Sequence, residues 1–416
     1  MNTRRNTVGG LLIAGLHYRP EPSGNAPYTS GLANGLSDRG SNVRVITGYP
    51  HYPEWKRYQG YSGWKRQETI DGVHVRRLSH FIPRRPRGLA RLWMEVSFGL
   101  RLAFARWHSP SVMVLVSPAL FAAGIALIRA RLTRQKSPVV IWVQDLYSLG
   151  MTETGTSGSF GARLMGSLES AVLRSADGVV VIHDRFKAYT VSQLGLDPYR
   201  VTVIRNWTHL KPYYLEDRER SRLSFGWSAE DIVVLHAGNM GAKQGLDNVV
   251  EAARVSEARG SSVRFVLVGD GNQRARLERK AEGAEHIRFV DSLPGTRFQE
   301  ALASADILLV NELPGVKEMS VPSKLTSYFS SGVPVLAATD AGSVTAEEID
   351  RAKAGMRVDA GDPAAMIDAA ERLVADPKAA KVFADNGRQF VETTLSEDHA
   401  VSQYDQYLTQ LIAASK

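Results

Sequence analysis

The chain is 416 residues long, 44% hydrophobic and 23% charged, and contains no cysteine. This length predicts two domains of about 200 residues each, because a single hydrophobic core rarely grows so large. Without cysteine, both a disulfide framework and a thiolate metal site are excluded. The apolar run near the N-terminus spans about ten residues, which is short for a membrane span, and no small-residue cleavage site follows it. We therefore expect a cytoplasmic protein.

The net charge of +8 is divided unequally along the chain. Residues 1–205 hold 27 Lys and Arg against 12 Asp and Glu (+15), whereas residues 206–416 hold 24 against 31 (−7). This asymmetry predicts that the first half faces an anionic partner, which could be a bilayer, a phosphate-rich ligand or a nucleic acid.

Short runs that are apolar at every position recur along the chain, each followed by a loop and a helix-like stretch. Such runs predict strands covered on both faces, as in parallel sheets wrapped by helices. They are 10–14, 43–47, 112–116, 139–143, 179–182 and 201–204, then 232–235, 263–268, 287–290, 307–310 and 333–337. The alternation predicts an α/β protein with two Rossmann-like, doubly wound domains, 1–205 and 206–395. We expect a polar linker over 211–231, and a terminal helix within 396–416 that packs back on the first domain.

Residues 49–66 interleave aromatic and basic side chains. Aromatic faces pack on sugar rings, and cations bind phosphate. The pattern favours recognition of a saccharide acceptor over simple packing of the loop. The candidate acceptor-binding residues are Tyr52, Trp55, Lys56, Arg57 and Trp64.

The stretch 82–107 predicts a helix with an apolar stripe among many arginines. The stripe comprises Leu89, Leu92, Trp93, Val96, Leu100, Phe104 and Trp107, and the arginines are 84, 85, 87, 91, 101 and 106. A helix lying on its own sheet explains the stripe. The arginines exceed what packing requires, and they suit docking on an anionic membrane surface.

Gln144 and Asp145 directly follow the apolar run 139–143. A carboxylate at the end of a buried strand can accept or orient a proton near a reacting hydroxyl. Asp145 is a candidate catalytic residue, a role that the family resemblance given below implies, with a helix N-cap as the alternative.

Three loops in the second half carry glycine or lysine where a helix is about to begin. In "GNMG" (238–241) successive amides could form an anion-binding nest, with Lys243 adding a charge. In "VGDG" (268–271) Gly269 and Asp270 leave room for a nucleobase or ribose. In "PSKLT" (322–326) Ser323 and Lys324 suit a second phosphate contact. A helix-capping turn is a sufficient explanation for the first loop or the third loop taken alone. It is a weaker explanation for three such loops at successive strand ends, which favours a phosphate site.

The order "GNMGxxQG", "VGDG" and "PSKLT…GVPV" resembles glycosyltransferase family 4 of the GT-B fold, and the bacterial polysaccharide enzymes within it in particular. The opening "YRPEPSGNAPYTSGLANGL" is also similar to that family. The likeness implies two Rossmann-like domains facing across a cleft. It also implies that Gly24 approaches the donor diphosphate. This chain departs from the family at the usual Arg and Lys positions, which hold Asn239 and Gln244.

Two further departures concern glutamates that in the family contact the donor. Ser327 stands at one of these positions and Met319 at the other, where Glu312 or Glu318 could substitute. The donor-binding candidates are then Gly24, Asn239, Lys243, Gln244, Gly269, Asp270, Ser323, Lys324 and Ser327. Lys243 is also a catalytic candidate, because it would stabilise charge on the leaving diphosphate.

The resemblance implies a retaining transfer from a nucleotide sugar, commonly UDP-linked, with no metal and no cofactor. The expected acceptor is a polyprenyl-diphosphate-linked saccharide at the inner face of the cytoplasmic membrane, in surface polysaccharide synthesis. A nucleotide-sugar 2-epimerase of the same fold is one alternative. A non-enzymatic basic adaptor for membranes or nucleic acid is another, but it leaves the loops of the acidic half without a role, so we expect no nucleic-acid partner.

Overall fold

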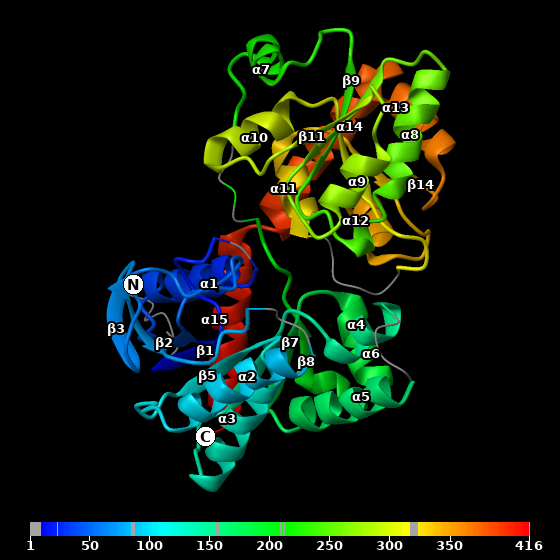
Figure 1. The fold of residues 1–416 in the computed structure, drawn as a ribbon. Coiled ribbons are helices and arrows are strands. Elements are labelled where there is room, and N and C mark those ends of the chain that lie inside the picture. The colour runs from blue at the N-terminus through cyan, green and yellow to red at the C-terminus, as the bar shows by residue number, and fades with distance from the viewer. Residues whose placement is uncertain are drawn as a thin grey trace. The chain divides into compact units, whose positions relative to one another are not determined.

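The computed structural model describes residues 10–22, 24–84, 88–154, 159–208, 210, 213–316 and 323–415. The chain forms two compact units, Met1–His209 with Ser396–Lys416, and Leu210–Leu395 (Figure 1). Each unit has its own sheet wrapped by helices, so the predicted α/β class is confirmed. Within the described residues, no helix combines the length and the apolar character that crossing a membrane requires.

The first unit is built on a sheet in the order β3-β4-β2-β1-β5-β6-β7-β8, in which only the β3–β4 pair is antiparallel. Its strands are β1 (Leu11–Gly15), β2 (Val43–Gly48), β3 (Lys65–Ile70), β4 (Val73–Leu78), β5 (Val112–Ser117), β6 (Val139–Val143), β7 (Gly178–Val181) and β8 (Val201–Val203). Its helices are α1 (Ala26–Asp38), α2 (Gly88–Ala103), α3 (Leu120–Leu132), α4 (Tyr147–Thr154), α5 (Ser159–Arg174), α6 (Asp184–Ser192), the 3₁₀ turn η1 (Pro198–Arg200) and α15 (Glu397–Ala414).

Helix α15 lies against the same sheet face as α1, although more than 350 residues separate their sequences (Figure 1). Gly35 of α1 makes this close approach possible, since a Cβ there would lie 2.7 Å from Val401. Tyr404 packs on Trp142 of β6, with 5.1 Å between the ring centroids. The C-terminal segment thus completes the core of the first unit.

The second unit has six parallel strands in the order β11-β10-β9-β12-β13-β14. Its strands are β9 (Ile232–Ala237), β10 (Val263–Val268), β11 (Ile287–Val290), β12 (Ile307–Asn311), β13 (Val335–Ala338) and β14 (Gly355–Val358). Its helices are α7 (Arg218–Phe225), the 3₁₀ turn η2 (Ala242–Gln244), α8 (Asp247–Ala258), α9 (Arg274–Lys280), α10 (Gly295–Ser304), α11 (Ser323–Ser331), α12 (Val344–Ala352), α13 (Pro363–Ala375) and α14 (Pro377–Thr394).

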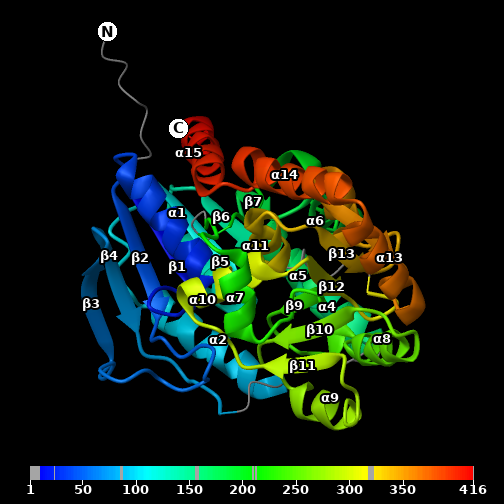
Figure 2. The ribbon, with the colours of Figure 1, turned by 90° about the horizontal axis from the view of Figure 1, so that it is seen from above.

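Three strands and one helix were not predicted from the sequence. Strands β3, β4 and β14 lack a continuous apolar run, because each lies at or beside a sheet edge where the strand is not fully buried. Figure 2 shows β3 and β4 at the edge of the first sheet. The expected linker instead contains α7, whose Arg222 donates to Asp306 at 2.8 Å. Two guanidinium groups of α7 reach that carboxylate, so the segment is fixed to the second unit.

Helix α2 turns most of its predicted apolar stripe outward. Leu89, Trp93, Leu100 and Phe104 are 82%, 54%, 43% and 88% exposed. The buried face is made instead by Met94, Glu95, Phe98, Gly99 and Leu102. The interpretation of the stripe as the sheet-facing side was therefore wrong for those four residues. Arg85 and Arg87 lie outside the described residues.

Candidate functional site

In the second unit, the loops after β9 and β10 pack on each other through their backbones. The N–H of Gly238 donates to Val268 O, and that of Met240 to Asp270 O, both at 2.8 Å. Gly269 has φ +134°, and a Cβ there would collide with the carbonyl oxygen of Gly238. Glycine is therefore needed here for contact between the two loops, whereas the sequence analysis explained it by the approach of a nucleobase.

The expected anion-binding nest is not formed over 238–241. Besides the two amides just described, the N–H of Gly241 donates to Oε1 of Gln244 at 3.0 Å. Gln244, a predicted donor-binding residue, therefore shapes its own loop. Its backbone carbonyl accepts from Nδ2 of Asn311 at 2.7 Å. Asn311 was missed in the sequence, although a buried amide that ends the apolar strand "ILLVN" is a visible signal.

The other polar candidates of these two loops reach solvent. Asn239, Lys243 and Asp270 are exposed. The backbone carbonyl of Lys243 accepts from Leu313 N at 2.9 Å, which fixes the turn. Asp270 accepts the N–H of Gly271 at 2.7 Å. Lys243 is thus available to an anionic ligand at the carboxyl edge of the sheet.

Lys324, in the first turn of α11, lies under the loop after β9. Its Nζ is 3.2 Å from Nε2 of His236, and its Cε would lie 3.9 Å from a Cβ on Gly238. Burial lowers the pKa of Lys324 to about 7, although the charge of Glu312 opposes this shift. Burial, with the Lys324 charge beside it, also holds the pKa of His236 well below its usual value. A neutral imidazole therefore accepts from an ammonium that gives up its proton unusually easily.

Glu312 follows β12, and two threonine hydroxyls bind its carboxylate. Thr339 donates to one oxygen, and Thr345 donates to the other at 2.7 Å. Burial raises the pKa of Glu312, while the two hydroxyls and Lys324 oppose the rise. The carboxyl group is thus positioned at the same sheet edge as Lys324.

Other donor candidates are placed differently. Glu318 and Met319 lie outside the described residues, as does the side chain of Ser323. Ser327 is buried and lines a small pocket with residues of α10, together with Leu210 and Tyr213. The structure thus groups Lys324 with His236 and Gly238, and it places Ser327 against α10.

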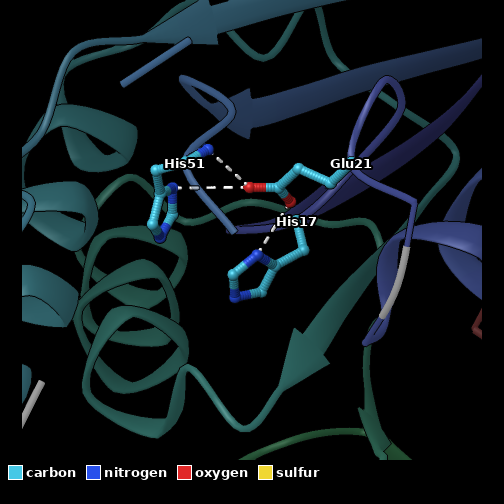
Figure 3. Close-up of side chains that lie close together, drawn as sticks. All are labelled: His17, Glu21 and His51. Carbon is cyan, nitrogen blue, oxygen red and sulfur yellow. Dashed lines mark hydrogen bonds and ion pairs between the residues drawn. The ribbon is translucent and has the colours of Figure 1, made fainter. Parts of the chain in front are cut away.

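In the first unit, the loop after β1 and the loop after β2 meet at a buried carboxylate (Figure 3). Glu21 accepts the backbone N–H of His51 at 2.8 Å and that of Tyr52 at 2.9 Å on one oxygen. Its other oxygen lies 2.8 Å from Nδ1 of His17. His17 and Glu21 were not singled out in the sequence, because 30 residues separate Glu21 from His51 and no short motif joins them.

The network sets the charge of its members. Burial by itself would raise the pKa of Glu21. The hydrogen bond and charge of His17, together with His51, outweigh that effect, so the pKa lies below its usual value. Burial and the charge of His17 lower the pKa of His51. The ligand atoms of the three residues lie within 4.8 Å of one another, close enough to hold a metal ion. The carboxylate already accepts two amides, however, which is the geometry of a hydrogen-bonded support for the loop.

Two of the five acceptor candidates join this network. The ring of Tyr52 lies 5.6 Å from that of His17 and 5.7 Å from that of Trp55. Gly24 has φ +66°, and a Cβ there would lie 3.3 Å from the Tyr52 ring. Glycine is therefore required at position 24 by its own backbone.

The remaining acceptor candidates point elsewhere. Lys56 is exposed. Arg57 lies over the Tyr49 ring at 5.1 Å. Trp64 is 77% exposed, with Arg101 of α2 over its ring at 4.7 Å. The structure thus brings Tyr52 and Trp55 together and does not group the other three with them.

A small pocket of about 30 Å³, with both apolar and polar lining, opens beside this network. Its polar and aromatic lining consists of His17, Asn25, Trp55, Arg91, Glu95 and Tyr147. Burial raises the pKa of Glu95 to about 7, although the Tyr147 hydroxyl donates to it. The pocket brings a carboxyl group, an imidazole and aromatic rings around a space of about the size of one water molecule.

Asp145 follows β6 and is partly exposed. Its Oδ1 accepts the N–H of Leu146 at 3.0 Å. The first amides of α4, those of Tyr147 and Ser148, instead donate to Glu169 at 2.8 and 3.1 Å. Because Glu169 accepts these two N–H groups, Asp145 does not cap them.

Comparison with known proteins gives matches across both units. Two family models match, a glycosyl transferase 4-like domain over residues 23–207 and glycosyl transferases group 1 over residues 231–376. A colanic acid biosynthesis glycosyl transferase of Escherichia coli (strain K12), WcaI, is 30% identical over 337 residues, covering 77% of this chain and 81% of that protein.

Two solved structures have a similar fold. Sucrose-phosphate synthase from Thermosynechococcus elongatus superposes with a TM-score of 0.73 at 18% identity, over 97% of this chain and 99% of that one. Anabaena HepE in complex with UDP-glucose superposes with a TM-score of 0.68 at 16% identity, over 98% of this chain and 100% of that one.

Proposed function

This chain belongs to the glycosyltransferase family matched above, with the GT-B fold, and from that premise we propose that it moves a sugar from a nucleoside-diphosphate donor to a lipid-linked saccharide. The donor is a UDP-sugar, and the acceptor is carried on a polyprenyl diphosphate during synthesis of a surface polysaccharide. Transfer retains the anomeric configuration and needs no bound metal. The complex of HepE with UDP-glucose supports the choice of donor, and the colanic acid relative supports polysaccharide synthesis.

One observation carries the donor assignment, which is that Nζ of Lys324 lies 3.2 Å from Nε2 of His236 under the loop after β9. Burial lowers the pKa of both groups there. As the glycosidic bond breaks, negative charge grows on the leaving diphosphate. A lysine that is already desolvated and positioned stabilises that charge without reorganisation. Bound diphosphate would in turn favour the protonated form of Lys324.

A transfer assay tests this function. The full chain is incubated with UDP-, GDP-, dTDP- and ADP-linked sugars and a detergent-solubilised polyprenyl-diphosphate saccharide. We expect release of UDP that depends on the acceptor, and a product whose anomeric configuration, read by NMR, equals that of the donor. Absence of product with every donor, together with a salt-dependent shift of duplex DNA, would favour the adaptor instead.

Asp145 is proposed to orient or accept the proton of the acceptor hydroxyl. Asp145→Asn should lower kcat by about 100-fold, since general-base catalysis contributes about that much, and should leave UDP affinity unchanged. Titration of UDP against the wild type and this variant provides the comparison. Asp197→Asn, at the exposed residue that caps η1, serves as a charge-matched control. Equal losses of kcat in the two variants would contradict this role.

The outward face of α2 is proposed to dock on the anionic inner membrane surface, where the acceptor is held. Leu89, Trp93, Leu100 and Phe104 would enter the interface, and Arg101 would meet lipid phosphates. Exposed aromatic and aliphatic side chains with nearby arginines bind such surfaces through both area and charge.

Vesicle binding should therefore depend on this face. Leu89→Ser with Phe104→Ser should reduce co-sedimentation with phosphatidylglycerol vesicles by about tenfold, because two large apolar side chains no longer leave water. Leu223→Ser, at a residue 74% exposed on α7, is the matched control. Unchanged sedimentation of the double variant would rule out docking through α2.

A further inference from the structure

A second pocket lies in the first unit, away from the carboxyl edge of the sheet. Its volume is about 410 Å³, within the range of small-molecule sites. Leu12, Arg44 and His74 contribute to it, and each is the second residue of its strand. The residues of the candidate site follow the other ends of the strands, so this pocket is separate from them.

Strand register places the basic groups of this pocket on one sheet face. Leu12 is paired with Arg44, and Arg44 with His74. Arg76, two residues beyond His74, projects from the same face, because side chains alternate along a strand. The pocket lies over the part of the sheet that consists of β1, β2, β4 and the edge strand β3 (Figure 2). Arg106, Trp107 and His108, which follow α2, complete the wall.

The charge of this pocket is not balanced from within. Glu68 is the one acidic side chain among the described residues that line it. Glu68 is paired with Val75, so it projects from the opposite face, where it binds the buried Arg77. Nε of Arg76 is buried without a hydrogen-bond partner within the described part of the chain. Guanidinium groups that lie together without a carboxylate between them repel one another. A bound anion would offset this electrostatic repulsion.

The floor of the pocket is apolar and fixed. Leu12, Ile46 and Trp107 are buried. The indole N–H of Trp107 donates to Leu102 O at 3.1 Å. The guanidinium carbon of Arg129, from α3, lies 3.7 Å from the centre of the Trp107 ring. The pocket thus joins a rigid apolar surface to a group of cations.

We propose that this arginine pocket, defined by Arg44, Arg76 and Arg106 with Trp107, binds a ligand that carries a phosphate or diphosphate group. The planar guanidinium fork matches phosphate oxygens bidentately, and the apolar floor would accept the body to which the phosphate is attached. A soluble nucleotide or sugar phosphate and a lipid headgroup share this chemistry.

Calorimetric titration of the full chain tests the proposal, with pyrophosphate, UDP, and vesicles of phosphatidylglycerol or phosphatidylcholine as probes. Arg44→Gln with Arg76→Gln should weaken one binding event about 100-fold, because two charge-assisted contacts are lost at about tenfold each. Arg131→Gln with Lys136→Gln removes the same charge from exposed positions of the same unit, and should change nothing. Thermal unfolding of both double variants verifies that they fold.

The outcomes separate the possible sources of the phosphate. Loss of pyrophosphate or UDP binding in the arginine variant alone assigns a soluble ligand. Loss of phosphatidylglycerol binding alone, with no binding of the free anions, assigns a lipid headgroup. Identical titrations of the arginine variant and the wild type with all the probes would overturn the proposal. Variants of Lys324 test the donor site independently. The arginine-pocket proposal and the donor-site proposal can therefore fail separately.

Discussion

Replacing Lys324 with methionine should lower kcat for sugar transfer by about 100- to 1,000-fold, the usual effect of removing one preorganised group that stabilises a developing anion. The side chain is held beneath the loop after β9, with its Nζ 3.2 Å from Nε2 of His236. Methionine is unbranched and one atom shorter than lysine, and it removes the charge together with the N–H donors. The measurement is the rate of UDP release at saturating donor and acceptor.

The fold should survive this substitution. Removing a desolvated ammonium takes away an unfavourable burial, so the unfolding temperature should stay equal or rise while transfer is lost. Lys381→Met, at an exposed α14 lysine paired with Asp385 at 2.5 Å, is the matched control and should be fully active. Turnover near the wild-type rate in the Lys324 variant would end its assignment to the donor site.

Lys324 should also make donor affinity depend on pH. Burial lowers its pKa to about 7, so the unliganded protein loses this charge as the pH rises through 7. The diphosphate prefers the charged form, and UDP affinity should therefore fall as the pH increases from about 6 to 8. Lys324→Arg, which stays charged throughout, should remove that dependence. A parallel decline in both proteins would assign the titration to another group.

Replacing Glu21 with alanine should lower the free energy of unfolding by about 3 kcal/mol, because a buried hydrogen-bonded charge is removed from its partners. The amides of His51 and Tyr52 would lose their acceptor, and His17 would lose the group that orients its ring. We expect the acceptor kcat/KM to fall while UDP affinity is kept. Chemical denaturation and steady-state kinetics measure the two effects.

The contribution of Glu21 to the free energy of unfolding should depend on pH in a definite direction. The pKa of Glu21 is below its ordinary value of 4.5 in the folded protein, so the unfolded chain binds more protons in the window below 4.5. Its stabilisation is complete above that window and is lost as the pH falls through the lowered pKa. Glu21→Gln should flatten the acid side of the stability profile, whereas Glu54→Gln, at an exposed carboxylate of the same loop, should not. Equal profiles for the two variants would contradict a supporting role for Glu21.

The strands at the centre of each sheet were predictable because their signal is local. Strands such as β6, with the sequence "VVIWV", are apolar at every position because helices cover both faces. Edge strands such as β3, with the sequence "KRQETI", are exposed along most of their length. Their pairing partners lie elsewhere in the chain, so composition alone does not reveal them.

The glycines of the second unit show how a motif can be visible in the sequence while the packing around it is not. Gly238 and Gly269 mark the loops that the sequence analysis selected. Their spacing does not reveal that each loop is the nearest neighbour of the other, with a hydrogen bond from Gly238 N to Val268 O. Only the packing of β9 beside β10 produces that contact.

By itself, the sequence determined the fold class, most of the buried strands, the glycine-containing loops at their ends, and the excess of cations in the first half. These properties follow from periodicity and composition within a few residues. The tertiary structure alone decided that Lys324 meets His236, that Glu21 supports the loop at His51, that α2 turns its apolar stripe outward, and that three arginines share one pocket. Such relations join residues distant in the chain, and they depend on which side chains lose water when the helices and strands pack.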